Sequence, residues 1–202
     1  MPLDLSAMQT LAEACAPSVA PATLLAISKV ESGFDPLVIG VNGTAPRRLS
    51  FQSPSAAAAA ARQLIAEGAS VDLGLGQINS RNLPGLGLSL EAAFDPCRNL
   101  AAAAQVLVSD YLRTAHAVGQ EQYGLRTALS YYNTGRPDRG FTNGYVTKVL
   151  AAAARIVPAL AAPDIQPLFP PPHAPSEHPA WAVFGGAPAS SFVLIPSNGA
   201  SQ

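Results

Sequence analysis

The sequence predicts a mostly α-helical fold with little or no β-structure, followed by a proline-rich extended tail. The first 157 residues contain repeated helix start and stop signals and carry all 12 Lys and Arg residues. From Pro158 onward the chain contains 10 of its 19 prolines, and neither a helix nor a central strand sustains such a density. Strand-like alternation is scarce, and RRLSF (47–51) is its only fair candidate. We therefore expect one domain over residues 1–157 and an extended tail over residues 158–202.

Six helices are expected in the domain, and each has its own boundary signals. Proline suits the first position of a helix and glycine its end, while Ser, Thr, Asp and Asn cap the amino terminus. The opening helix is expected over residues 5–16. Pro21 and Gly33 bound the second helix, Ser53-Pro54 opens the third, and Asp95-Pro96 opens the fourth. In order, the helices after the first are expected over residues 21–32, 54–68, 96–119 and 121–135, and the last from Thr142 or Asn143 to residue 157.

Composition excludes several classes of function. Of the 202 residues, 49% are hydrophobic and 12% charged, and the net charge is −1. A strongly basic nucleic-acid-binding surface and a polybasic membrane anchor are therefore not expected. No uninterrupted apolar run reaches the roughly 20 residues that a membrane-spanning helix needs. The amino-terminal segment lacks a basic start and a long apolar stretch, so it does not resemble a secretory signal.

Glu31 is the candidate catalytic residue, since it ends a predicted helix just before a Ser-Gly pair. Leu24, Ile27 and Ser28 precede it by seven, four and three residues and share its helix face. Because Leu24 and Ile27 are core-type residues, we expect Glu31 to point toward the interior or a cleft. Partial burial and the negative end of the helix dipole would both raise the pKa of its carboxyl group, as a general acid requires. A surface glutamate at a frayed helix end is the alternative.

Two further stretches place polar side chains beside glycines. DLGLGQIN (72–79) contains Gln77, which can both donate and accept hydrogen bonds. LSYYNTG (129–135) ends a helix with two tyrosines and an asparagine, which offer sugar rings a stacking surface and fixed polar groups. A glycine-rich turn that enters a helix, and tyrosines packed on the core, are the structural alternatives. The first stretch lacks the G-x-G-x-x-G spacing of dinucleotide sites. AFDPCRNL (93–100) is interpreted as structural.

The two cysteines leave two alternatives open. Cys15 and Cys97 are either buried thiols or one disulfide between helices, which would imply an oxidising compartment. Neither they nor the three scattered histidines have the spacing of a zinc site. We therefore expect no metal and no cofactor.

Four motifs in a fixed order resemble those of the lysozyme-like lytic transglycosylase domain: AISKVESGF (26–34), DLGLGQIN, DPCRNL (95–100) and SYYNTG (130–135). The similarity is to the VirB-type members attached to type IV secretion and conjugation machines. It covers residues 10–157 and leaves the tail outside. Two positions depart from the family pattern, Gly76 where Met is usual and Thr134 where Ala is usual. The first departure is expected to widen the cleft floor or to alter its grip on substrate.

The resemblance implies cleavage of the β-1,4 bond between N-acetylmuramic acid and N-acetylglucosamine in peptidoglycan, with a 1,6-anhydro product. Glu31 would be the single acid and base, and Tyr132 would position it. Gln77 and Asn133 would hold sugar. The remaining residues expected to bind substrate are Ser32, Gly74 and Asn79. A hydrolase that cuts the same bond with water, and a non-catalytic glycan-binding assembly factor of the secretion machine, are the alternatives.

The resemblance also bears on the cysteines, and the local sequence suggests structural roles for two other acids. Related domains commonly carry a cysteine at both places, which favours a disulfide between Cys15 and Cys97. Asp35 precedes a proline and is expected to form a turn. Asp72 is expected to cap the following helix rather than to act as a catalyst.

The implied partners are peptidoglycan glycan strands and type IV secretion subunits. The apolar segments of residues 181–196 are the candidate contact with these subunits, and residues 192–195 would add as a strand to a partner's sheet. A tail with stray apolar residues is the alternative. The substrate is periplasmic, so we expect the protein in the periplasm, although no export signal is visible and the export route stays open. No nucleic acid is expected as a partner.

Overall fold

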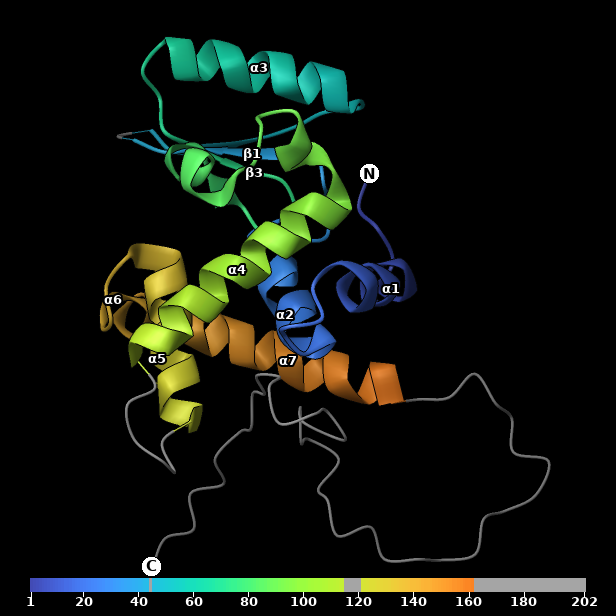
Figure 1. Ribbon diagram of the computed structural model, residues 1–202, viewed down its shortest axis with the longest axis vertical. Coiled ribbons are helices and arrows are strands. Elements are labelled where there is room, and N and C mark those ends of the chain that lie inside the picture. Colours follow the sequence, from blue (N-terminus) through green and yellow to red (C-terminus); the bar gives the residue numbers. More distant parts are fainter. Residues whose placement is uncertain (44, 115–120, 162–202) are drawn as a thin grey trace, which may run out of the picture.

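The computed structural model describes residues 1–43, 45–114 and 121–161, and this part of the chain is mostly helical. In Figure 1, α3 and a small sheet form one part of the molecule, most other helices form a second part, and α4 runs diagonally from one to the other. In chain order the elements are α1 (Leu5–Cys15), α2 (Pro21–Glu31), β1 (Val38–Val41), β2 (Arg47–Ser50), α3 (Pro54–Ala66), β3 (Val71–Leu73), β4 (Ile78–Asn79), three single-turn 3₁₀ helices (Ser80–Asn82, Pro84–Leu86 and Ala92–Phe94), α4 (Pro96–Thr114), α5 (Glu121–Thr134), α6 (Arg139–Thr142) and α7 (Tyr145–Ala161).

Several of the predicted boundary signals act where we expected them, whereas Thr142 ends the short α6 and α7 begins at Tyr145 instead of at Thr142 or Asn143. Ser53 Oγ accepts a hydrogen bond from the Ala56 amide at 3.2 Å, and Asp95 Oδ1 accepts one from the Arg98 amide at 2.8 Å. Each bond satisfies an amide that the first turn of a helix leaves unpaired. Gly33 follows the end of α2 with φ at 65°, the left-handed conformation in which helices commonly stop.

The last helix is longer than predicted. α7 continues through Pro158 to Ala161, whereas we expected it to end before the proline. Leu160 packs against the core and holds this turn, although Pro158 has no amide hydrogen to donate. The helix expected to close near Gly119 is described as far as Thr114, and its remainder lies outside the described residues, as does the proposed contact segment 181–196.

The structure contains a four-stranded antiparallel sheet, which corrects the expectation of little or no β-structure. The strand order is β2-β1-β3-β4, with Ile39 of β1 opposite Leu49 of β2 and Leu73 of β3. The one predicted strand candidate, RRLSF, contributes β2 at the edge. The other strands contain two to four residues, too few to show alternation, and the pairing of β1 with β3 joins residues 30 to 34 positions apart in the chain. α3 packs against β1 and β3 (Figure 1).

α2 lies in the middle of the helical part, where it packs against α7, α1 and α4 (Figure 1). Residues 22–28 are all buried. Leu24 and Ile27 have no exposed area, so the helix face that leads to Glu31 is a core face, as predicted. This burial fixes where the carboxylate at the end of the helix can point.

A disulfide joins Cys15 at the end of α1 to Cys97 in the first turn of α4, with their Cα atoms 5.3 Å apart. The two helices also pack against each other, so the bridge ties the amino-terminal helix to the long helix that links the two parts. Within the described ranges, no helix is both long and apolar enough to cross a bilayer.

Candidate active site

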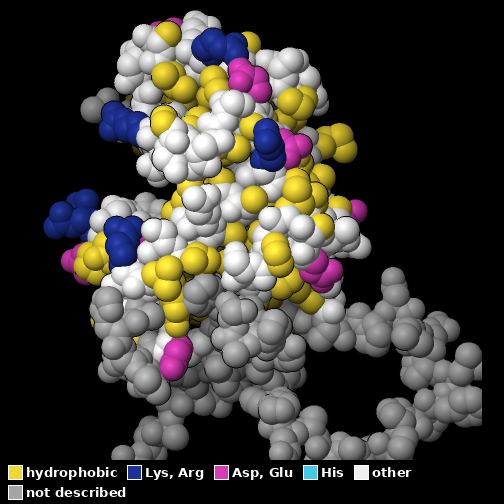
Figure 2. Space-filling view, in the orientation of Figure 1, with side chains coloured by type: hydrophobic (Ala, Val, Ile, Leu, Met, Phe, Trp, Pro, Cys, Tyr) yellow, Lys and Arg dark blue, Asp and Glu magenta, His cyan; other side chains and the backbone are white. Residues whose placement is uncertain are grey.

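A cavity of about 590 Å³ lies where the sheet, α2, α4 and α5 meet, and Figure 2 shows the surface notched on its left side between the two parts. Ligand sites commonly have volumes of roughly 300–1,000 Å³. Most of the side chains around the cavity are polar. They are Glu31, Asn42, Arg48, Asp72, Gln77, Ile78, Asn79, Asn82, Val106, Asp110, Arg113, Tyr131, Tyr132, Asn133, Thr134 and Gly135.

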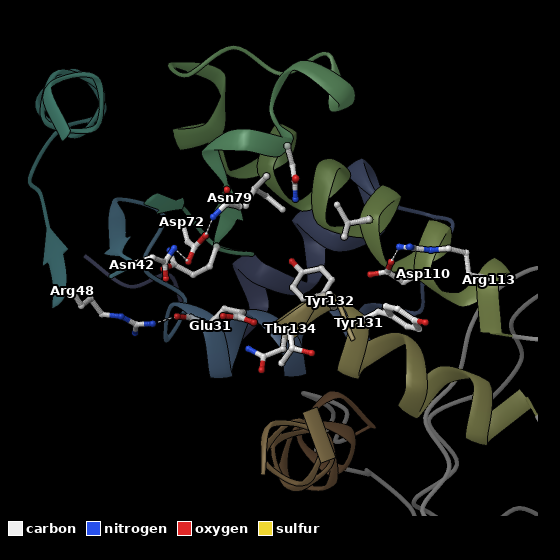
Figure 3. A pocket seen from close by; sticks show the side chains of 16 residues that line it. Glu31, Asn42, Arg48, Asp72, Asn79, Asp110, Arg113, Tyr131, Tyr132 and Thr134 are labelled. Atoms are coloured by element: carbon white, nitrogen blue, oxygen red, sulfur yellow. Dashed lines mark hydrogen bonds and ion pairs between the residues drawn. The ribbon is translucent and has the colours of Figure 1, made fainter. Parts of the chain in front are cut away.

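Glu31 contributes its carboxyl group to the wall of this cavity (Figure 3). Its Oε1 accepts a hydrogen bond from the Tyr145 hydroxyl at 2.6 Å, and the Arg48 guanidinium donates to its main-chain carbonyl. Burial raises the pKa of Glu31 to about 7; the hydrogen bond from Tyr145 opposes this rise, the negative charge of Asp72 adds to it, and the charge of Arg48 opposes it. The predicted rise in pKa is thus confirmed, and its largest cause is the one we expected.

Tyr145 makes the contact to Glu31 that we expected of Tyr132. It begins α7, is 5% exposed, and lies 114 residues beyond Glu31 in the chain. The Tyr132 hydroxyl instead donates to the carbonyl oxygen of Gly76 at 2.7 Å. Burial and the nearby charge of Glu31 raise the pKa of both tyrosines, so both are donors at neutral pH. Nothing in the sequence around Tyr145 distinguishes it, because the packing of α7 against α2 creates the contact.

Asp72 lies in β3 and lines the cavity, which corrects the expectation that it caps a helix. No helix follows directly, because the chain turns and pairs back as β4. Its two carboxylate oxygens accept hydrogen bonds from Asn79 Nδ2 at 2.6 Å and Asn42 Nδ2 at 2.8 Å (Figure 3). Burial raises the pKa of Asp72, and the two hydrogen bonds oppose the rise. The cavity therefore contains a second carboxyl group beside Glu31.

Ser32 and Asp35 stabilise the chain just after Glu31. Ser32 was expected to bind substrate, but it is buried, does not line the cavity, and directs its hydroxyl to the Ser28 carbonyl at 3.0 Å. Asp35 forms the predicted turn, since its Oδ1 accepts from the Leu37 amide at 3.0 Å. Both side chains therefore fix the backbone that follows the helix, and neither faces the cavity.

Gly74 was also expected to bind substrate; it does not line the cavity and instead lies in close contact with the Asn99 side chain and the Ala93 backbone. A Cβ atom at this position would lie 2.5 Å from Asn99 Nδ2 and 2.6 Å from the Ala93 carbonyl oxygen, and its φ is 70°. Asn99 is buried and holds the turn: it accepts from the Gly76 amide at 2.7 Å and donates to the carbonyls of Leu73 and Ala93 at 2.9 and 2.7 Å. Asn99 belongs to the DPCRNL stretch, which we interpreted as structural.

Gly76 was expected to widen the cleft floor or to alter its grip on substrate; it is not among the residues that line the cavity, and two side chains surround it closely. A Cβ atom here would lie 2.7 Å from Ala103 Cβ and 2.9 Å from the Tyr132 hydroxyl oxygen. These two side chains fill the space that a larger residue would take. Glycine at this position lets the Tyr132 hydroxyl reach the backbone carbonyl of the turn.

The other residues expected to bind sugar do line the cavity, namely Gln77, Asn79, Tyr132 and Asn133. Gln77 has φ at 49° and donates through Nε2 to the Gly74 carbonyl at 2.9 Å, so the amide is fixed by its own turn. Asn133 accepts from Asn143 Nδ2 at 2.9 Å on the opposite, α5 side. The fold thus brings four predicted binding residues and Glu31 to one cavity.

Further lining residues come from places that the sequence did not single out. Arg48 stands on the edge strand, and Asp110 and Arg113 stand in the last turns of α4. Local composition carries no signal for them, since an Arg or Asp on a helix face is most often solvated. Among the described residues, no group of three or more His, Cys, Asp or Glu side chains is placed to hold a metal ion.

Comparison with known proteins identifies the family. The transglycosylase SLT domain family matches residues 8–152. The chain is 46% identical to Protein virB1 of Rhizobium radiobacter over 162 residues, which are 80% of this chain and 67% of that protein. It is 44% identical to the type IV secretion system protein virB1 of Brucella abortus biovar 1 over 151 residues, which are 71% of this chain and 62% of that protein. The chain thus spans about two thirds of the length of these relatives, and no solved structure matches it. It belongs to the transglycosylase SLT family and is a peptidoglycan lytic transglycosylase of the VirB1 type.

Proposed function

We propose that Glu31 alone serves as acid and base in cutting the β-1,4 bond between N-acetylmuramic acid and N-acetylglucosamine, and that the product is a 1,6-anhydro sugar. The observation that supports this is a cavity carboxyl group whose pKa is raised to about 7 and whose Oε1 is held by Tyr145. A group with such a pKa is partly protonated at neutral pH, so it can give a proton in one step and take one in the next.

The reaction would proceed in two steps. Glu31 first protonates the glycosidic oxygen, and the bond from this oxygen to C1 breaks as positive charge develops on the ring. The ionised Glu31 then takes the proton of the C6 hydroxyl of the same sugar, whose oxygen attacks C1. The acetamido group of the substrate can stabilise the cation between the steps, so no protein nucleophile is required. The hydrogen bond from Tyr145 stabilises the ionised form of Glu31 that exists between them.

Hydrolysis of the same bond is a second candidate, and Asp72 is the observation that favours it. Its carboxylate lines the same cavity as Glu31 and is oriented by two asparagine amides. A second carboxylate in a glycosidase can activate a water molecule, which would attack C1 in place of the C6 hydroxyl. The product would then have a reducing end.

Mass spectrometry of digested, purified peptidoglycan separates the two reactions. We expect fragments with 1,6-anhydro ends. Fragments with reducing ends would contradict the single-glutamate proposal in favour of hydrolysis. The Asp72→Asn variant supplies the control, because it should remove reducing ends only if Asp72 activates water.

Two substitutions are expected to shift the pH dependence of cleavage in opposite directions. A general acid must be protonated, so kcat/KM should fall as pH rises through the pKa of Glu31, about 7. Tyr145→Phe removes a hydrogen bond that lowers this pKa, so the fall should move to higher pH. Asp72→Asn removes a charge that raises it, so the fall should move to lower pH. If the pH profiles of kcat/KM of both variants shift in the same direction, or do not shift, the fall in kcat/KM at high pH cannot be assigned to Glu31.

The relatives suggest where the reaction takes place. The name of the Brucella abortus relative connects it with type IV secretion, and we propose that this chain opens the cell wall locally for assembly of such a system and acts in the periplasm. Contact with secretion subunits through residues 181–196 stays a prediction from the sequence.

A further inference from the structure

Three side chains that the proposed reaction does not use lie together in the cavity, on the opposite side of Glu31 from Arg48 (Figure 3). Asp110 and Arg113 are one turn apart on α4, and Tyr131 is on α5. This group combines a cation, an acid and an aromatic ring, so its chemistry differs from that of the amide-rich sheet side.

Arg113 is held from two sides. Its Nη2 donates to Asp110 Oδ1, and its Cζ lies 5.0 Å from the centre of the Tyr131 ring. The Asp110 side chain is 5% exposed, whereas that of Arg113 is 60% exposed. The acid is therefore buried behind the cation, and the cation is the member of the pair that a ligand can reach.

The ion pair with Asp110 occupies only part of the hydrogen-bonding capacity of Arg113. Burial raises the pKa of Asp110, and the charge and hydrogen bond of Arg113 oppose the rise, so part of the attraction offsets the cost of burying the acid. A guanidinium group has five N–H donors in a rigid planar fork, and the bond to Asp110 uses one of them. The buried acid and the stacked ring fix the direction of the fork, which leaves donors for a planar anion.

We propose that Arg113, oriented by Asp110 and Tyr131, is a carboxylate-binding subsite that recognises an acidic group of the peptidoglycan strand bound in this cavity. This inference rests on the proposed function and deepens it. Arginine binds carboxylates through two parallel hydrogen bonds. The sugar rings themselves are uncharged, so the carboxylate comes either from the lactyl group of N-acetylmuramic acid, which is free where no peptide is attached, or from a peptide stem.

The test measures binding in the Glu31→Gln background, where substrate is expected to stay intact, so that the subsite is examined without turnover. Three soluble glycan preparations serve as probes: fragments with peptide stems, the same fragments after an amidase has removed the stems, and fragments whose carboxyl groups have been converted to neutral amides. Dissociation constants are measured by calorimetry with and without Arg113→Gln. If the wild-type chain fails to cleave peptidoglycan but Arg113→Gln still weakens binding to carboxylate-bearing fragments, the proposed reaction fails and the subsite stands.

Arg113→Gln should weaken binding about tenfold or more, as expected for loss of a hydrogen-bonded charge. The loss should occur with stem-bearing fragments if the stem supplies the carboxylate, and with amidase-treated fragments if the lactyl group does. Neutralised fragments should bind both proteins equally. An equal loss on neutralised fragments, or no loss on any preparation, would overturn the proposal.

Two further variants separate recognition from general effects. Arg98→Gln removes a cation from an exposed position of the same helix outside the cavity, so it should leave glycan binding unchanged. A loss of affinity equal to that of Arg113→Gln would show a general charge effect and overturn the subsite.

Arg113→Lys keeps a cation beside the buried Asp110 but lacks the planar fork. It should keep the thermal unfolding midpoint and show an intermediate loss of affinity for carboxylate-bearing fragments, and wild-type affinity in this variant would contradict bidentate recognition.

Discussion

Glu31→Gln is expected to reduce cleavage of purified peptidoglycan at least about a hundredfold, because loss of a general acid costs roughly 10²–10⁴-fold. The amide is nearly isosteric and can still accept the hydrogen bond of Tyr145, but it cannot donate a proton and take it back. Release of soluble muropeptides is the measurement, and the thermal unfolding midpoint should stay close to that of the wild type.

The matched control is Glu67→Gln, which removes a carboxylate from an exposed position at the end of α3, away from the cavity. This variant should keep full activity. If Glu31→Gln retains more than about a hundredth of wild-type activity, the assignment of the general acid is wrong. If neither the wild type nor the variant cleaves and both bind glycan equally well, the chain acts as a non-catalytic assembly factor.

Removing the disulfide is expected to lower the free energy of unfolding by on the order of 4 kcal/mol in the chain-entropy model. Cys15 and Cys97 are 82 residues apart, so the bridge restricts a long loop of the unfolded chain. Denaturant unfolding of the double variant Cys15→Ser, Cys97→Ser, compared with the oxidised wild type, measures the difference.

Reduced wild-type protein provides the control for this comparison, since it should match the double variant in stability. The unfolded, non-reduced wild type should show no titratable thiol. Two free thiols, or equal stability of the oxidised protein and the double variant, would show that the bridge does not contribute in solution.

The helical part of the fold could be predicted because its signals are local. Ser53 and Asp95 cap helices through amides three residues away, and Gly33 ends α2 through its own backbone conformation. The sheet could not be predicted in the same way. β1 gains its partners from segments up to 34 residues away, as in the pairing of Ile39 with Leu73, and such pairing leaves no periodic trace in four residues.

The candidate site, like the fold, contains residues that local sequence could indicate and residues whose position depends on tertiary contacts. Glu31 could be proposed from one helix face, and Gln77, Asn79, Tyr132 and Asn133 from motifs whose order resembles a known family. Ser32 and Gly74 belong to the same motifs, yet their contacts are structural. Proximity in a motif therefore did not separate residues that face the cavity from residues that hold its backbone, because both kinds are equally close to Glu31 or Gln77 in the chain.

The sequence by itself determined that α2 ends in a carboxylate on a core face, because helical periodicity fixes which residues share that face. Only the tertiary structure decided what surrounds this carboxylate. Tyr145 reaches Glu31 across 114 residues when α7 packs on α2, and Asp72 faces the same cavity because β3 pairs with β1 and β4 instead of opening a helix. The pKa of Glu31 depends on burial and on these neighbours, and such contacts form only when elements distant in the chain pack together.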